Sequence, residues 1–588
     1  MRFTYNMILR ILISIVSIFF IHTVYAGSST VVVKQGDNYI KVFASENTNY
    51  IICEDIDLGN QKVKIGKGCV LVFEGGSLAN GTVIGNKTCV RAHDYEIFKR
   101  GYVRYRTYLE KGTPRNTPPS VKKEYHNCLI IEGTWNNKKC KDNWTGLLNH
   151  NDEDVMLALK NFITLHKSGV KIKLPTITAL GYERAVIPGN HIIDFNNSKI
   201  SYPDDLSAWE DGSIEIPEGT KPCKLETGYG LITLRSNTTI ENLTLDGKSL
   251  FRQDEPVRLG VSCILAVGNS QNVTIKNVSV INILGPAVTV QSEAKDLLFK
   301  ICKFYNIGEH VVYSHQYKGY CHFEECVFDT WDSDRVSEYR NGIDYLYKHK
   351  PIREKGNISF DELYKFDLTF NGCIFNNPHR INSQRRTLGG FFTGTFPVVV
   401  NIKKCSFQGT LPIVNPGIGS AITEEVEKPY RMIYHSCDGA PYVYSAKSNC
   451  NIIMEFFDCI NIPFRTVYAK CYYNCKLYLD VFENNVENVT SAFKAEFSEP
   501  MVIKNCEFTD RGLTGKIKHP VYHRPVVFEN CNFFCASNRE SIVDVLTYKE
   551  SAEAIATFKN CTIDIPGYRL VGGLEKEKVN IINCKISL

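Results

Sequence analysis

The sequence predicts an all-β solenoid, on the basis of a recurring short pattern, its spacing and a shift in the alternation of apolar residues. The pattern occurs in ten segments. It spans six positions. The first is apolar, the second is usually polar, the third is Asn or a substitute, the fourth is Cys or another apolar residue, and the sixth is again apolar. Ile503-Lys504-Asn505-Cys506-Glu507-Phe508 is one copy. Self-similarity at a period of about 20–50 residues is typical of solenoid architectures.

The spacing supports one elongated body rather than several globular domains. The fourth residue of the pattern lies at Leu243, Val278, Cys302, Cys326, Cys373, Cys405, Cys506, Cys531, Cys561 and Cys584. The first five intervals are 35, 24, 24, 47 and 32 residues, and after a weaker stretch the last three are 25, 30 and 23. The base period is therefore near 24 residues, and the interval of 47 is a doubled coil or a coil with a long inserted loop.

The alternation of apolar residues changes phase inside the pattern. In the segment Asn272–Val280, apolar residues alternate up to Ile275, shift across Lys276 and Asn277, and alternate again from Val278. Two short strands joined by a bend produce such a shift, and Asn tolerates the left-handed backbone that a bend requires. We expect the recurring Asn side chains to form a ladder of amides between coils. The alternative interpretation is that they bind sugar or carry N-glycans, as in the sequon Asn277-Val278-Ser279.

This combination resembles the right-handed parallel β-helix, or pectate-lyase-like, superfamily, from about Leu225 onward. The resemblance implies coils of three short parallel strands with an Asn ladder at one bend. Upstream, apolar residues at helical spacing in 154–163 predict a helix that caps the first coil, and Gly169–Pro175 reads as a strand. Short alternating strands with Gly-Gly and Asn-Gly turns in 64–90 resemble the small β-rich leader of exported bacterial β-helix proteins.

These features predict four parts of the chain. Residues 1–26 carry two Arg residues, a short apolar core and small residues before Gly27, which is typical of a cleaved secretory signal. A small β-rich module then spans 27–110, a linker or long loop 111–150, and the β-helix 151–588, with a loop insertion near 329–369. We therefore expect a secreted, periplasmic or cell-surface protein. No later segment is apolar enough to span a membrane, and a net charge of +5 gives no indication of a nucleic-acid partner.

The 22 cysteines predict core packing more than a disulfide framework. Those in the repeat occupy the inward slot that Leu243 and Val278 fill in earlier copies, and free Cys is among the most buried residue types. Cβ atoms stacked about 4.8 Å apart also lie slightly beyond the separation of a disulfide. Local bridges between Cys471 and Cys475 or between Cys531 and Cys535 remain an alternative.

Function is expected where loops interrupt the pattern, above all between Cys326 and Cys373. Charged residues and tyrosines are concentrated in and around this insertion and suit an elongated sugar chain. The catalytic candidates are Glu309, His310, His315, His379 and Arg380, and the substrate-binding candidates are Arg335, Arg340, Asp344, Tyr345, Arg385 and Arg386.

These residue types fit two chemistries. His and Arg could remove a proton beside a uronate carboxylate and neutralise that carboxylate, as a polysaccharide lyase requires. Two carboxylates across the bond would instead serve a glycoside hydrolase. A third interpretation is that His310 packs inside a strand and the insertion is a solvated loop. We expect a protein that binds or acts on polysaccharide, the alternative being a non-catalytic, adhesin-like scaffold. No metal site or cofactor is indicated, although a lyase could use Ca²⁺, and the sequence leaves the oligomeric state open.

Overall fold

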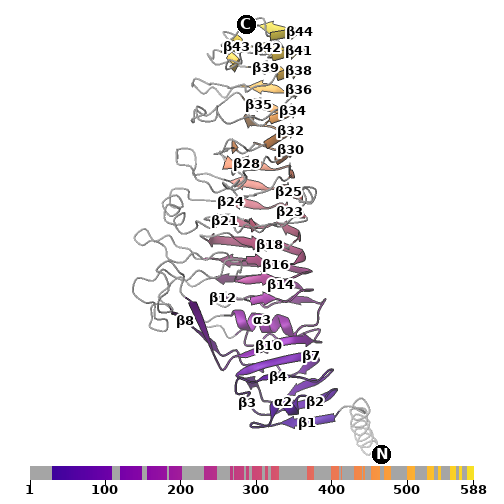
Figure 1. Cartoon of the computed structure of the whole chain (residues 1–588), viewed down its shortest axis with the longest axis vertical. Coiled ribbons are helices and arrows are strands. Elements are labelled where there is room, and N and C mark those ends of the chain that lie inside the picture. Colours follow the sequence, from indigo (N-terminus) through magenta and orange to yellow (C-terminus); the bar gives the residue numbers. More distant parts are fainter. Residues whose placement is uncertain are drawn as a thin grey trace, which may run out of the picture.

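The computed structural model is a column of stacked coils with the N-terminal strands at one end and the C-terminal strands at the other (Figure 1). It describes residues 29–108, 120–148, 155–181, 185–201, 231–247, 265–268, 270–283, 287–290, 295–307, 312–314, 320–329, 367–376, 399–408, 412–413, 430–439, 442–443, 452–463, 469–478, 500–509, 526–534, 541–544, 556–564, 569–572 and 579–587. All strand pairs but one are parallel among these residues, which confirms the predicted solenoid.

The longest sheet has 20 strands and runs along the column from the first coil of the β-helix to the last. Its strands are β11 (Lys171–Lys173), β12 (Thr178–Leu180), β14 (Ile192–Ser201), β16 (Thr238–Asp246), β18 (Gln271–Ile283), β20 (Lys295–Lys300), β21 (Lys303–Ile307), β23 (Tyr320–Glu324), β24 (Val327–Asp329), β25 (Asp367–Asn371), β26 (Ile374–Asn376), β27 (Val399–Lys403), β28 (Ser406–Gln408), β30 (Tyr430–His435), β32 (Ile452–Phe457), β34 (Ala469–Tyr473), β36 (Met501–Lys504), β38 (Val526–Glu529), β41 (Ala556–Lys559) and β44 (Val579–Ile582).

Shorter parallel sheets form other faces of the coils. One consists of β13 (Ala185–Ile187), β15 (Ile232–Leu234), β17 (Leu265–Val267), β19 (Val288–Val290) and β22 (Val312–Ser314). Another consists of β33 (Ile462–Pro463), β35 (Lys476–Tyr478), β37 (Glu507–Thr509), β39 (Asn532–Phe534), β42 (Thr562–Asp564) and β45 (Lys585–Ser587). The pairs β29 (Pro412–Ile413) with β31 (Tyr442–Val443) and β40 (Ser541–Asp544) with β43 (Arg569–Gly572) complete them. Parallel strands in one sheet are connected in the right-handed sense, which gives the column its hand.

The predicted bend and Asn ladder are confirmed. Asn277 has a φ of 48°, and its Nδ2 donates to Oδ1 of Asn242 in the preceding coil at 2.7 Å. In the C-terminal coils the same bond runs from Asn505 to Asn474 at 3.0 Å, and from Asn530 to Asn505 at 3.2 Å. The ladder therefore holds successive bends in register and leaves the outward strand faces to other residues.

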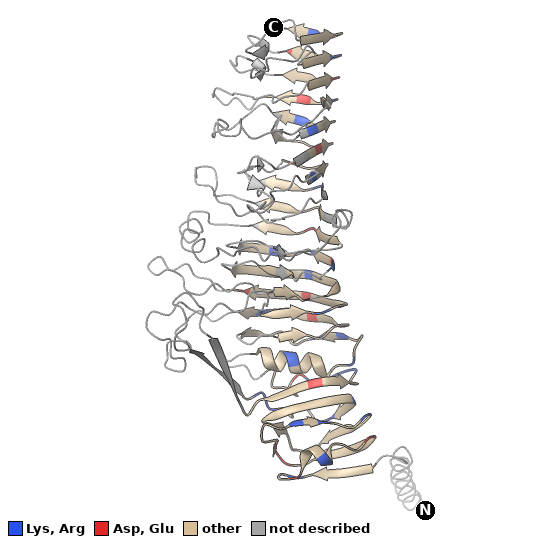
Figure 2. Ribbon diagram, viewed as in Figure 1, with Lys and Arg blue, Asp and Glu red and all other residues tan. Residues whose placement is uncertain are grey.

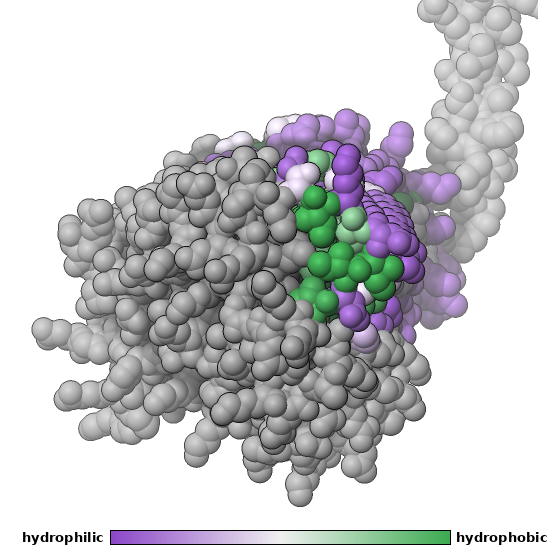
Figure 3. All heavy atoms as spheres, turned by 90° about the horizontal axis from the view of Figure 1, so that it is seen from above, coloured by the Kyte–Doolittle hydropathy of each residue, from purple (hydrophilic) through white to green (hydrophobic). Residues whose placement is uncertain are grey.

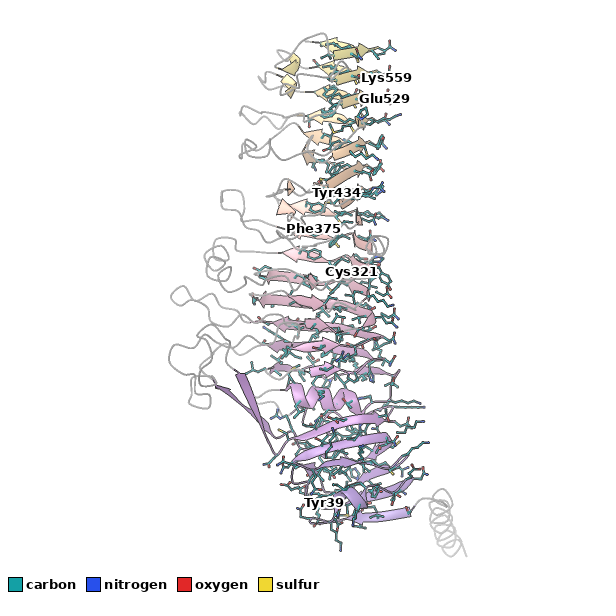
Figure 4. All side chains as sticks on the ribbon, viewed as in Figure 1. Tyr39, Cys321, Phe375, Tyr434, Glu529 and Lys559 are labelled. Carbon is teal, nitrogen blue, oxygen red and sulfur yellow. The ribbon has the colours of Figure 1, made fainter. Side chains whose placement is uncertain are left out.

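Cysteines fill one inward column, as predicted. The column also includes Cys437, Cys459 and Cys475, which occupy the interval where the sequence pattern is weak. Every described cysteine is free, so Cys471 and Cys475 are not bridged, and Cys535 lies outside the described residues. Beside the column, inward aromatic rings stack from coil to coil, with centroids 4.7 Å apart for Phe375 and Phe407. Figure 4 shows Phe375 and Tyr434 within the stack.

The small N-terminal module is itself a short parallel solenoid. Its strands are β1 (Ser29–Val33), β2 (Thr48–Ile52), β4 (Lys62–Lys64), β5 (Val70–Phe73), β7 (Gly81–Arg91) and β10 (Leu129–Trp135), and β3 (Ile56–Asp57) pairs with β6 (Leu78–Ala79). A helical turn, α2 (Tyr39–Val42), and the antiparallel pair β8 (Tyr102–Tyr108) and β9 (Ser120–His126) complete it. Strands β9 and β10 occupy part of the segment 111–150 that was expected to be a linker.

The predicted capping helix is α3 (Met156–Leu165), and it lies between the module and the β-helix, against β10 on one side and β13 on the other. The fully buried Asn161 side chain continues the hydrogen bonding of β10. Its Oδ1 accepts from the Ile131 amide at 3.0 Å and its Nδ2 donates to the Leu129 carbonyl at 2.7 Å. Val155 is the N-cap of the helix.

The apolar core reaches the last described coil. Seen along the column, apolar side chains come to the surface at the C-terminal end, beside hydrophilic residues (Figure 3). In the last described coil, Ile581 and Ile582 are 47% and 44% exposed. No described helix is both long enough and apolar enough to cross a membrane.

Candidate functional site

All the candidates from the sequence lie outside the described residues. These are Glu309, His310, His315, His379 and Arg380 for catalysis, and Arg335, Arg340, Asp344, Tyr345, Arg385 and Arg386 for substrate binding. Their roles therefore stay predictions. The described part of the chain offers a different site.

That site is a cleft of about 600 Å³ on the N-terminal module, which we call the N-terminal cleft. It is lined by Gln35, Asp55, Ile56, Asp57, Ser77, Ala79, Glu96, Lys99, Arg100, Gly101 and Asn127. Successive coils supply these residues, so the cleft runs across the stacked strands and not along one of them.

Inward apolar residues position the walls of the cleft. Ile56, Leu78 and Phe98 are buried in the core, and they stack through the β3–β6 pairing and the bridge between Leu78 and Phe98. Since side chains alternate along a strand, the neighbours of these residues face the cleft. Gly76 lets two coils approach, because a Cβ there would collide with the backbone of Glu54.

Two aspartates on one strand face supply hydrogen-bond acceptors. Oδ1 of Asp55 accepts from the buried Ser77 hydroxyl at 2.6 Å. Oδ1 of Asp57 accepts from the Gly59 amide at 2.7 Å and from Nδ2 of Asn80 at 2.8 Å. All three bonds use Oδ1, so the two carboxylates are held in fixed orientations with Oδ2 left for a ligand.

The opposite wall carries both signs of charge. Glu96 Oε1 accepts from the Arg100 amide at 2.7 Å, which fixes the turn that presents Lys99 and Arg100. Counting Asp55 and Asp57, the cleft contains three carboxylates and two cations. Figure 2 shows that both signs are also mixed along the rest of the column. A mixed set of donors and acceptors suits a polar ligand with many hydroxyl groups better than a strongly charged one.

The carboxylates do not form a metal site. Nowhere in the described part of the chain do three or more His, Cys, Asp or Glu residues lie close enough to hold a metal ion.

The cleft was not predicted from the sequence, because residues 64–90 were interpreted only as strands broken by turns. A signal was available in the spacing. Asp55-Ile56-Asp57 and Ser77-Leu78-Ala79 are offset by 22 residues, and Phe98 follows Leu78 by 20. A search for a second, shorter repeat upstream of the main one would have stacked these segments.

Comparison with known proteins adds only distant likenesses. No family model matches the chain, and neither does any curated protein. Among solved structures, tailspike protein 3 of bacteriophage CBA120 is similar, with 11% identity over 74% of this chain and a TM-score of 0.33. The chain spans 59% of that tailspike's length.

Two other similar structures are covered almost completely. The adhesin PfbA of Streptococcus pneumoniae has 11% identity over 75% of this chain and 95% of its own, with a TM-score of 0.30. The A-module of the Azotobacter vinelandii mannuronan C-5 epimerase AlgE6 has 10% identity over 75% and 97%, with a TM-score of 0.27. Likenesses this distant carry no argument about activity. The parallel strand register described above shows by itself that the chain has a parallel β-helix fold.

Proposed function

We propose that the protein binds polysaccharide in the N-terminal cleft, outside the cytoplasm or at the cell surface. The observation that carries this proposal is the set of fixed carboxylates, amides and cations that line one open cleft across stacked coils. Carboxylates and amides fixed by the protein can bind sugar hydroxyls without first losing conformational freedom. The cleft is open and polar. A polysaccharide that extends beyond the cleft on both sides requires both properties.

A second candidate function is hydrolysis of a glycosidic bond. Asp55 and Asp57 both line the cleft and supply it with two neighbouring carboxylates. Glycoside hydrolases use a pair of carboxyl groups that flank the scissile bond. The lyase alternative depends on His310 and its neighbours, which lie outside the described residues.

A glycan panel with one matched pair of variants tests the proposal. Asp57→Asn should weaken binding of neutral oligosaccharides about tenfold, because a hydrogen bond to a charged group contributes about 1.5–3 kcal/mol. Asp194→Asn is the control. The Oδ1 of Asp194 also accepts from an Asn side chain, at 2.8 Å, and from a backbone amide, at 2.9 Å, but on the β-helix. Equal effects of the two variants, or no binding by the wild type, would refute the proposal.

The same incubations separate binding from catalysis. New reducing ends that disappear in Asp55→Asn would identify a hydrolase, whereas new absorbance from an unsaturated uronate would identify a lyase. Binding without either product is the outcome expected for a carbohydrate-binding scaffold.

A further inference from the structure

A second group of polar side chains lies on the outward face of β30, β32 and β34, far from the N-terminal cleft. It comprises Arg431, Glu455, Lys470, His435, Phe457, Tyr473 and Cys471, and we call it the outer cluster. Register places it on three neighbouring coils. Glu455 lies opposite Cys471, Arg431 lies one outward position earlier on β30, and the aromatic residues His435, Phe457 and Tyr473 share the next row.

Glu455 is the centre of the charged group that Arg431, Glu455 and Lys470 form. It faces outward and yet is only 4% exposed. Its Oε2 accepts from Nε of Arg431 at 2.6 Å, and its Oε1 lies 3.8 Å from Nζ of Lys470. Two cations and one carboxylate leave a net charge of +1. The ion pair with Glu455 uses Nε of Arg431. The Arg431 side chain, which also carries two terminal guanidinium nitrogens, is 50% exposed.

A β-bulge places Lys470 beside Glu455. Met454 pairs with Ala469 but Glu455 pairs with Cys471, so Lys470 is an extra residue in β34. Without the bulge, Lys470 would lie opposite Met454 of the previous coil, and its side chain would point into the core as that of Met454 does. Bulges re-aim side chains and are frequent beside functional sites. Here the bulge turns a lysine out of the core and toward the buried carboxylate.

The aromatic row gives the cluster an adjoining flat wall. The rings of His435 and Phe457 stack with centroids 4.8 Å apart, and those of Phe457 and Tyr473 with centroids 5.5 Å apart. Burial, and then the charge of Glu455, raise the pKa of Tyr473, so its hydroxyl stays protonated and can donate a hydrogen bond. Burial and Glu455 also raise the pKa of Cys471 to about 11, so this thiol adds no charge.

Two other triads on the column serve as comparisons. Glu241 lies between Lys171 and Lys276, and Glu529 lies between Lys504 and Lys559. The side chains of Glu529 and Lys559 point outward in Figure 4. Both triads use lysine alone. The side chain of Glu455 is 6% exposed, against 12% for Glu241 and 25% for Glu529. The outer cluster therefore differs in its arginine, its bulge and its burial.

We propose that the outer cluster binds the carboxylate of an acidic sugar unit, with Arg431 and Lys470 as the charged contacts and Tyr473 as a hydrogen-bond donor. The planar fork of an arginine matches a carboxylate, and the excess positive charge favours an anion. This assignment rests on the proposed saccharide-binding function and gives it a second site with a preference for acidic chains.

The test compares a uronic acid oligosaccharide with its carboxyl-reduced, neutral counterpart by calorimetric titration at about 0.15 M ionic strength. Wild type should bind the acidic chain more tightly. Lys470→Gln and Arg431→Gln should each reduce that preference about tenfold, since each removes a charged contact. Lys559→Gln is the matched control, because Lys559 is 48% exposed, against 45% for Lys470, and also pairs with a glutamate. Lys559→Gln should change the preference for the acidic chain by less than about twofold, because isolated surface ion pairs contribute little free energy.

Three results would overturn the assignment. One is an acidic chain that binds no more tightly than the neutral one, and another is an equal effect of Lys470→Gln and Lys559→Gln. Both leave neutral binding in the N-terminal cleft, and hence the proposed function, untouched. The third is the absence of binding by either chain, which refutes the proposed function as well. Thermal unfolding of each variant shows whether a loss of binding is a loss of fold.

Discussion

At the scale of single residues, the bend before the cysteine column sets a backbone requirement that most coils meet with Asn. The exceptions lie in the middle of the column and include Ile301 and Glu325, which have φ values of 55° and 54°. A β-branched residue in this region is a genuine outlier, because its Cβ crowds the following carbonyl. The middle coils therefore carry local strain at the position where other coils gain an amide bond.

Replacing Ile301 by Asn should stabilise the protein by about 1 kcal/mol, through relief of the left-handed strain. The new amide could also donate to Asn277 and extend the ladder. Thermal unfolding measures the effect. Ile374→Asn is the control, because Ile374 is similarly exposed, at 38% against 44%, but has no positive φ. A gain of the same size in both variants would show that backbone strain is not the cause.

The column position itself explains why cysteine recurs. Sγ of Cys326 lies 3.5 Å from the Phe299 carbonyl and 3.4 Å from the Glu324 carbonyl, so the thiol donates where the bend interrupts the strand ladder. Ser198 fills the same column in an early coil and bonds to the Phe195 carbonyl at 2.5 Å. A small side chain with a donor suits the slot, and the thiol is the more apolar choice.

At the scale of elements, the junction around α3 contains two buried histidines. His166 follows the helix and bonds through Nδ1 to the Phe162 carbonyl at 2.9 Å. His191, in the first coil of the β-helix, is 4% exposed. Burial, and then the charge of His166, lowers the pKa of His191 to about 4, and burial lowers that of His166 as well.

Acid should therefore loosen this junction. Both histidines are neutral when folded, whereas in the unfolded chain they bind protons near pH 6.5, so the unfolded state takes up more protons below that pH. Their contribution to stability is complete above about pH 6.5 and is lost as the pH falls toward 4. Denaturant unfolding at several pH values should show a decline over this range, shallower in His191→Gln and unchanged in His93→Gln, whose histidine is exposed. Equal slopes in wild type and His191→Gln would contradict the assignment.

At the scale of the whole molecule, the cysteine column predicts a protein that keeps its thiols in an oxidising environment. Cys326 and Cys373 are 0% exposed, while Cys53 is exposed. Burial also raises the pKa of the Cys321 thiol well above its usual range, which removes the reactive thiolate. Alkylation of the native protein followed by peptide mapping should label Cys53 and spare the buried cysteines of the column, and denaturant should expose them. Fast native labelling of Cys326 would contradict the described core.

The repeat made the fold predictable, because one apolar period fixes both strand phase and stacking. Ile275 and Val278 already face inward in the sequence pattern, and the structure adds only the neighbours on which they pack. The N-terminal cleft was not predictable in the same way. Asp57 and Lys99 lie 42 residues apart and belong to coils whose short repeat is obscured by turns. The outer cluster depends on a one-residue bulge at Lys470, and a bulge does not change the apolar period enough to be read from sequence.

Saccharide binding in the N-terminal cleft is the central claim, and hydrogen exchange with a bound neutral oligosaccharide tests it most directly. Slower exchange is expected at residues 55–57, 77–80 and 96–101, where adjacent coils would be held by one ligand. Asp57→Asn should remove that protection and Asp194→Asn should not. Protection confined to other coils, or no change on adding the oligosaccharide, would contradict the account.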